Sequence, residues 1–153
     1  GMVDWMRALC AHVAATRGAE RVGVVGMCLT GNFAMTLIAD EHVWAAVASQ
    51  PSLPARTEGF LNMSEAEVAA SRTALDAKGA MHAYRFREDP LCTGARFDAI
   101  DAAFNDDKVR VVLNVLDGSG HSVFAGHYDD TPGSQTAKAL DEVLGYFRAR
   151  LSS

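Results

Sequence analysis

The most informative stretch for the fold is uncharged: VGVVGMCLTGNFAMTLIA, residues 22–39. Its first part is rich in β-branched valine, which is typical of a strand covered on both faces. Its second part spaces apolar side chains at helical intervals, which indicates a buried helix. The stretch is 18 residues long, the length at which a membrane span becomes a candidate. Its glycines and polar residues favour a strand, a tight turn and a helix instead, so we expect no membrane partner.

Strands and helices alternate along the rest of the chain. Ser64 and Glu67 form a capping box that opens one helix, and Gly79 closes it. A loop containing Pro51 and Pro54 precedes that helix. Strands are predicted at residues 21–27, 44–49, 80–86 and 109–116, and helices at 5–19, 29–40, 64–78, 95–104 and 134–151. The helical stripes expected to be apolar are Trp5, Met6, Leu9, Cys10 and Val13; Phe33, Leu37 and Ile38; Phe97, Ile100 and Phe104; and Leu140, Val143, Leu144, Phe147 and Leu151.

This alternation predicts an α/β fold, with a parallel sheet of about four strands and helices on both faces. A length of 153 residues and a hydrophobic content of 49% fit a single domain. The net charge of −5 and the lack of a Lys/Arg cluster argue against nucleic-acid binding. Three cysteines are few for a disulfide scaffold, which favours a reducing cytoplasm. We interpret Gly1 as a tag remnant ahead of a natural start at Met2.

A candidate nucleophile lies at the strand-to-helix turn, within Gly26-Met27-Cys28-Leu29-Thr30-Gly31. A nucleophile elbow needs small neighbours, because the chain doubles back so tightly that its central residue is strained. Free N–H groups and the helix dipole at a helix amino end favour a thiolate over a thiol. The same residues would also suit an ordinary turn with Cys28 as a small buried side chain, and this segment alone does not separate the two interpretations.

Two residues in other strand-end loops favour the elbow. Asp89 directly follows the third predicted strand, and His121 follows the fourth. A thiol nucleophile needs a base, and the base needs an orienting carboxylate. Doubly wound hydrolases present these groups in the order nucleophile, acid, base. Asp117 is a competing acid, although it is too close to His121 in sequence to approach the ring easily from behind. The weaker candidates for the base, inside or beside predicted elements, are His12, His42 and His82.

The chain resembles the dienelactone hydrolase family, α/β-hydrolases that carry a cysteine where most relatives have serine. The motifs that carry the resemblance are the elbow, Asn32-Phe33-Ala34-Met35, Ser49-Gln50-Pro51-Ser52, Asp89-Pro90 and Gly120-His121-Ser122. The resemblance implies Cys28 as nucleophile, Asp89 as orienting acid and His121 as base, acting on a small-molecule ester or lactone. It also implies the Leu29 N–H as one oxyanion donor. No Cys/His group has the spacing of a zinc site, and we expect neither a metal nor a cofactor.

Three departures from the family bear on these expectations. Thr30 stands where the family usually has glycine. Ala125 lies four residues after His121, where members acting on dienelactones carry an arginine, so dienelactone itself is in doubt as the substrate. The resemblance covers only the carboxyl-terminal part of the family's fold, and the absent strands would hold the second oxyanion donor. The strand at residues 21–27 should then be a sheet edge, and we expect a homo-oligomer that covers it.

Two other functions stay open. A glutaminase-like amidotransferase has a Gly-x-Cys-x-Gly elbow, but it usually follows its histidine with Pro-Glu, and this chain has Ser122-Val123. A catalytically inactive remnant could persist as an oligomeric or binding module. Four further residues have minor expected roles. We expect Cys10 to be a packing residue and Cys92 to be able to approach the site. His127 and Tyr128 are candidates for the rim of a pocket.

Overall fold

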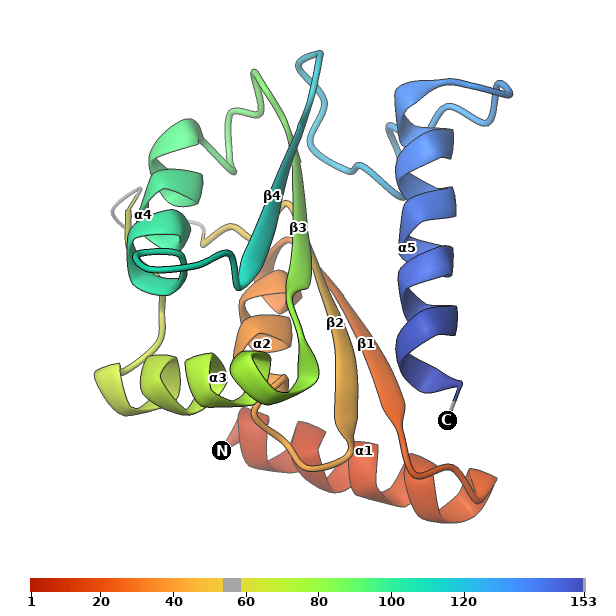
Figure 1. Cartoon of the computed structure of the whole chain (residues 1–153). Helices are drawn as coiled ribbons and strands as arrows, with labels where there is room; N and C mark the ends of the chain where they lie inside the picture. Colours follow the sequence, from red (N-terminus) through yellow and green to blue (C-terminus); the bar gives the residue numbers. More distant parts are fainter. Residues whose placement is uncertain (54–58, 153) are drawn as a thin grey trace.

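Helices and strands alternate along the whole of the described chain (Figure 1). The computed structural model describes residues 1–53 and 59–152, so Pro54, predicted to lie in a loop, is outside the described residues. The elements are α1 (Met2–Arg17), β1 (Val22–Met27), α2 (Leu29–Leu37), β2 (Val43–Ser49), α3 (Glu65–Lys78), β3 (Met81–Phe86), α4 (Gly94–Phe104), β4 (Val111–Leu116) and α5 (Gln135–Leu151). Each predicted strand and helix is present, with ends that differ from the prediction by a few residues.

The described strands form one four-stranded sheet in the order β1-β2-β3-β4, and every pairing is parallel. The predicted α/β fold is therefore confirmed. Met27 lies beside Ser49, Ser49 beside Tyr84, and Tyr84 beside Asn114. The carboxyl ends of the strands therefore reach the same edge of the sheet, and the loops that follow them meet there.

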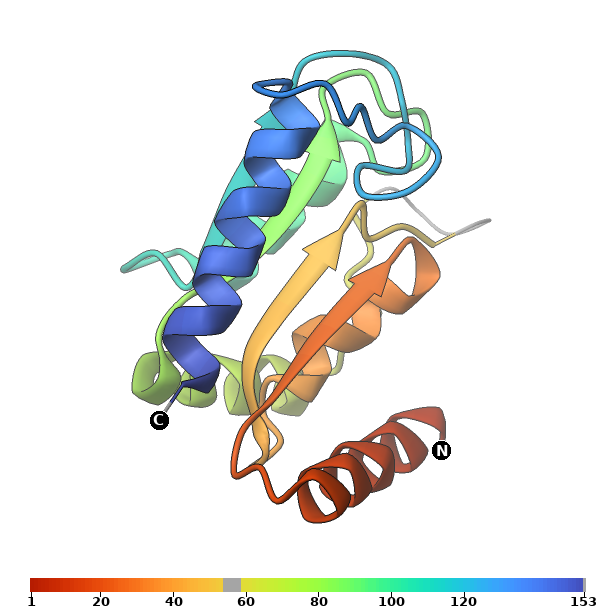
Figure 2. The same ribbon diagram turned by 90° about the vertical axis from the view of Figure 1, so that its right-hand side faces the viewer.

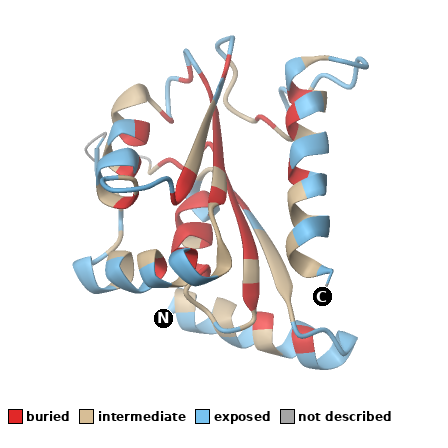
Figure 3. Ribbon diagram, in the orientation of Figure 1, coloured by how far each residue is buried: buried red, intermediate tan, exposed pale blue. Residues whose placement is uncertain are grey.

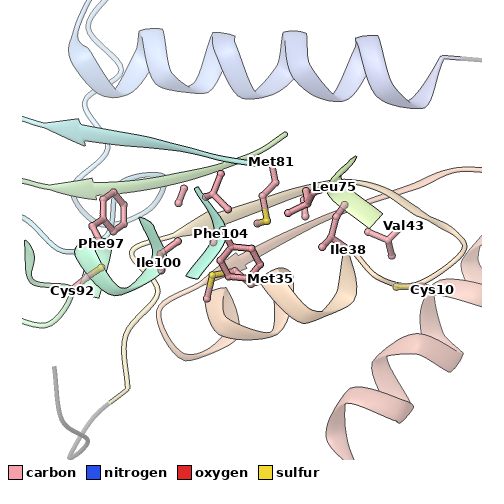
Figure 4. Close-up of a cluster of buried hydrophobic side chains, with 14 residues drawn as sticks. Cys10, Met35, Ile38, Val43, Leu75, Met81, Cys92, Phe97, Ile100 and Phe104 are labelled. Carbon is pink, nitrogen blue, oxygen red and sulfur yellow. The ribbon is translucent and has the colours of Figure 1, made fainter. Parts of the chain in front are cut away.

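Helices cover both faces of the sheet, with α5 alone on one face (Figures 1 and 2). The larger apolar cluster joins α2, α3 and α4 to the other face (Figure 4); its members include Met35, Ile38, Leu75, Met81, Ile100 and Phe104. A smaller cluster lies under α5 and includes Val47, Tyr84, Ala139 and Val143. Figure 3 shows the middle strands mostly buried, whereas β1 is only partly so. Within the described residues, no helix is both long and apolar enough to cross a membrane.

The predicted apolar stripe of α1 is wrong in part. Cys10 is buried as expected, but Trp5 is 64% exposed, Leu9 44% and Val13 38%. The reason is position: α1 lies beside the sheet margin and contacts mainly α2 and β1, so only one side of the helix finds a neighbour. Leu144 on α5 is also exposed, because that helix buries a narrower face around Ala139 and Val143.

Candidate active site

The turn between β1 and α2 has the backbone of a nucleophile elbow. Cys28 has a φ of 55° and a ψ of −121°, and it stands directly before the first residue of α2. A left-handed φ on a non-glycine residue costs on the order of 1–3 kcal/mol, and such strain clusters at functional sites. Gly26 is required here, because a Cβ at this position would lie 2.1 Å from the Thr30 carbonyl oxygen. The elbow tolerates the β-branched Thr30 because this residue is exposed. Its Oγ1 also accepts a hydrogen bond from the Met27 N–H at 2.9 Å.

Asp89 and His121 face each other across the loops after β3 and β4. The His121 Nδ1 lies 2.9 and 2.8 Å from the two carboxylate oxygens of Asp89. The Asp89 side chain is fully buried, and its Oδ1 also accepts hydrogen bonds from the N–H groups of Leu91 at 2.8 Å and Cys92 at 2.9 Å. The carboxylate is thus held from two sides, which fixes the orientation of the imidazole ring.

The competing acid, Asp117, is directed elsewhere. Its carboxylate pairs with the Arg87 guanidinium at 3.0 Å, and both side chains are well exposed. Of the two candidate acids, only Asp89 contacts the His121 ring.

The loop that carries His121 is organised by two side chains. The His127 Nδ1 accepts hydrogen bonds from the N–H of Ser122 at 3.2 Å and of His121 at 3.4 Å. The Gln50 Oε1, from the end of β2, accepts from the Val123 N–H at 3.3 Å. The sequence suggested His127 as part of a pocket rim. In the structure its side chain holds the backbone of the loop that carries His121.

Ser52 is the residue that sequence reasoning missed as part of this site. Its Oγ lies 3.1 Å from the Cys28 Sγ, and its N–H donates to the Cys28 carbonyl oxygen at 3.2 Å. The Asn32 side chain donates to the carbonyl oxygens of both Ser52 and Leu29 at 3.0 Å, so it ties this loop to the elbow. The available signal was positional: Ser52 follows the strand that pairs with β1, at the edge where the elbow lies.

The surroundings of Cys28 favour its thiolate. Burial by itself would raise the pKa of this thiol, but Ser52, the His121 ring and the Leu29 N–H together lower the pKa below its ordinary value. For His121, burial opposes the charged ring, but Cys28 and Asp89 raise the pKa above its ordinary value. Opposite shifts in neighbouring groups favour a thiolate–imidazolium pair. The buried Nε2 of His121 makes no hydrogen bond of ordinary geometry to a described residue, although the ring and Cys28 are close enough for each to shift the pKa of the other.

The other two cysteines are not activated in this way. Burial raises the pKa of the Cys92 thiol to about 12, and burial also raises the pKa of Cys10. Cys92 contributes to the site through its backbone N–H to Asp89 rather than through its sulfur. Among the described residues, no group of His, Cys, Asp and Glu side chains is placed to hold a metal ion.

Comparison with known protein families shows which family the chain belongs to. The model of the dienelactone hydrolase family matches residues 2–151. The chain belongs to the dienelactone hydrolase family. That match covers nearly every residue and agrees with the resemblance read from the elbow and the strand-end loops. No curated protein matches this family member.

Two solved structures resemble this dienelactone hydrolase family member with a TM-score of 0.59 each. One is an α/β hydrolase enzyme from the metagenome of sediments from the lagoon of Mar Chica, Morocco; it is 15% identical, and the match covers 97% of this chain and 70% of that one. The other is a membrane phospholipase A described as a bacterial virulence factor; it is 12% identical, and the match covers 95% of this chain and 64% of that one. At these identities the similarity shows the α/β-hydrolase fold.

Proposed function

We propose that this chain hydrolyses a carboxylic ester or lactone through Cys28, His121 and Asp89. The observation that carries the proposal is the contact of both Asp89 oxygens with the His121 Nδ1, at 2.8 and 2.9 Å, beside a cysteine in an elbow conformation. In this arrangement the Nε2, which makes no hydrogen bond of ordinary geometry to a described residue, is left to exchange a proton.

The proposed reaction has two halves. The Cys28 thiolate attacks the substrate carbonyl carbon, and the C–O bond to the leaving group then breaks as that oxygen takes the proton from the His121 Nε2. Water attacks the resulting thioester and gives a proton to Nε2, the C–S bond breaks, and the carboxylic acid leaves. The cysteine and histidine return to their starting charges.

The oxyanion that forms at each attack needs a hydrogen-bond donor. The Leu29 N–H is suited to this role because it lies at the first turn of α2 and already stabilises the Cys28 thiolate. Backbone N–H groups after the nucleophile act in this way in α/β-hydrolases.

Turnover of p-nitrophenyl acetate tests the proposal. The wild-type protein should release p-nitrophenol, and Cys28→Ala should fall to the rate of buffer. The matched control Cys10→Ala should keep its activity, because Cys10 lies on α1, packs in the apolar cluster and has a thiol whose pKa is raised by burial. Equal turnover in Cys28→Ala would contradict the proposal. Absence of ester turnover in the folded wild type would favour the inactive binding module, and glutamine hydrolysis in its place would favour the amidotransferase.

A further inference from the structure

A buried arginine in the first turn of α4, Arg96, contacts the helix that follows the elbow. Arg96 is 3% exposed. Its Nη2 donates to the Asn32 Oδ1 and, at 3.3 Å, to the Leu61 carbonyl oxygen. Asn32 lies in the first turn of α2, four residues after Cys28, and is also buried. The two helices cover the same face of the sheet (Figure 1), and this pair joins α4 to the helix that begins directly after the nucleophile.

A guanidinium is an unusual side chain for this buried position. Burial lowers the pKa of Arg96, because its charge is removed from water. A buried cation is normally compensated by a carboxylate. The hydrogen-bond partners of Arg96 among the described residues are instead an amide oxygen and a carbonyl oxygen. For packing alone, an apolar side chain of similar size would serve as well or better. Such departures from good packing practice concentrate at functional sites.

The guanidinium determines which end of the Asn32 amide faces it. Arginine has only hydrogen-bond donors, so it selects the oxygen of the amide. The Nδ2 is thereby turned to the other side, where it donates to the carbonyl oxygens of Leu29 and Ser52 at 3.0 Å each. Without Arg96 the amide would be free to reverse, and its oxygen would then face two carbonyl oxygens with which it cannot bond.

Three contacts hold Ser52 against the elbow and its helix. The Ser52 carbonyl oxygen accepts from Asn32, the Ser52 N–H donates to the Cys28 carbonyl oxygen at 3.2 Å, and the Ser52 Oγ lies 3.1 Å from the Cys28 Sγ. The loop also packs closely here, because a Cβ on Gly31 would lie 3.0 Å from the Pro51 Cα. The place of the Ser52 hydroxyl therefore depends on contacts of its own backbone, and Asn32 makes one of them.

We infer that Arg96 and Asn32 are positioning residues, which hold the Ser52 hydroxyl against the Cys28 sulfur. The inference rests on the proposed function, since it concerns how the nucleophile of that reaction is activated. Arg96 acts through Ser52 rather than by its own charge, because the causes that lower the pKa of Cys28 include the Ser52 hydrogen bond and do not include Arg96.

The pH midpoint of iodoacetamide labelling at Cys28 tests the inference. Arg96→Met removes the donor to Asn32 and keeps an unbranched side chain. It should raise the midpoint by about 1 pH unit, as Ser52→Ala does, because a hydrogen bond to the thiolate is lost. In the Ser52→Ala background, Arg96→Met should cause no further shift. A direct effect of the arginine charge on Cys28 would persist in that background.

Two further variants separate positioning from stability. Arg110 is a second buried arginine, directly before β4 and so at the amino end of the strands, where carboxylates pair with it. Arg110→Met should lower the thermal midpoint of unfolding but leave the labelling midpoint of Cys28 unchanged. The double variant Asn32→Leu/Arg96→Met removes both members of the pair, so neither is left buried without the other. It should raise the labelling midpoint as Arg96→Met does.

An unchanged labelling midpoint in Arg96→Met overturns the inference. A full shift that persists in the Ser52→Ala background, or an equal shift in Arg110→Met, overturns it as well. Loss of the fold in both Arg96→Met and the double variant also overturns it, because the pair would then be a structural requirement. The measurement needs no ester turnover, so the two proposals fail separately: turnover with an unmoved midpoint sinks only the positioning role, and the predicted shifts without turnover sink only the proposed function.

Discussion

Asp89→Asn separates the chemical role of the buried acid beside His121 from its structural role in holding its own loop. The new Oδ1 can still accept from the Leu91 and Cys92 N–H groups, which now donate at 2.8 and 2.9 Å, so the loop keeps its anchors. The new side-chain NH₂ would face the His121 Nδ1, however, where a carboxylate oxygen now lies at 2.8 Å. The ring then faces an amide NH₂ in place of one of its two carboxylate oxygens, and its charged form loses the negative charge that stabilises it.

The size of the effect follows from that lost contact. A hydrogen bond to a charged group contributes roughly 1.5–3 kcal/mol. This free energy corresponds to a change of about 1–2 in the pKa that governs the thiolate–imidazolium pair. The population of the thiolate–imidazolium pair at neutral pH should therefore fall roughly 10- to 100-fold. A more basic thiolate is also a stronger nucleophile, which recovers about 3- to 10-fold of the rate. The net loss in the alkylation rate of Cys28 should be about 3- to 10-fold.

Timed iodoacetamide labelling at neutral pH, followed by peptide mapping of Cys28, measures this rate without knowledge of the substrate. Asp117→Asn is the matched control, because the Asp117 carboxylate pairs with exposed Arg87 and does not contact the ring. If Asp117→Asn slows labelling as much as Asp89→Asn does, or if Asp89→Asn leaves the rate unchanged, the assignment of the acid is wrong.

Three further outcomes are expected. In the wild type, iodoacetamide should label Cys28 first and Cys92 last, because burial raises the pKa of Cys92 to about 12 while the neighbours of Cys28 lower its pKa; earlier labelling of Cys10 or Cys92 would refute this order. Ser52→Ala should move the pH midpoint of Cys28 labelling upward, since Ser52 lowers the pKa of that thiol, and an unchanged midpoint would show that the 3.1 Å contact is incidental. Gly26→Ala should lower the thermal midpoint of unfolding strongly, because its Cβ would lie 2.1 Å from the Thr30 carbonyl oxygen; Gly145→Ala, where no atom lies within 4 Å, should leave the midpoint unchanged or raise it, and equal effects would contradict the elbow geometry.

The order of strands and helices could be predicted from sequence because local patterns determine it. The valines before Gly26 and the helical spacing after Gly31 locate β1, the elbow and α2 without any knowledge of the neighbours. The meeting of Asp89 with His121 also follows from a general rule, since the carboxyl ends of parallel strands lie at one edge of a sheet.

The sequence could not predict features that depend on strand register or on whether another element covers a helix. The contact of Ser52 with Cys28 requires that Ser49 lie beside Met27, which only the paired strands reveal. The exposure of Trp5 could not be foreseen either, because its helical spacing is the same whether or not another element covers α1. In each case the outcome depends on whether residues distant in sequence come into contact.

Capture of the acyl-enzyme shows directly whether Cys28 is the nucleophile. The protein would be mixed with p-nitrophenyl acetate, quenched in acid and analysed by intact mass and peptide mapping. We predict one acetyl group on Cys28, none in Cys28→Ala, and slower loss of the acetyl group in His121→Ala than in the wild type, because water then lacks its base. Turnover of the ester with no acetyl group on Cys28, or with acetylation at another residue that Cys28→Ala does not remove, would show that Cys28 is not the nucleophile.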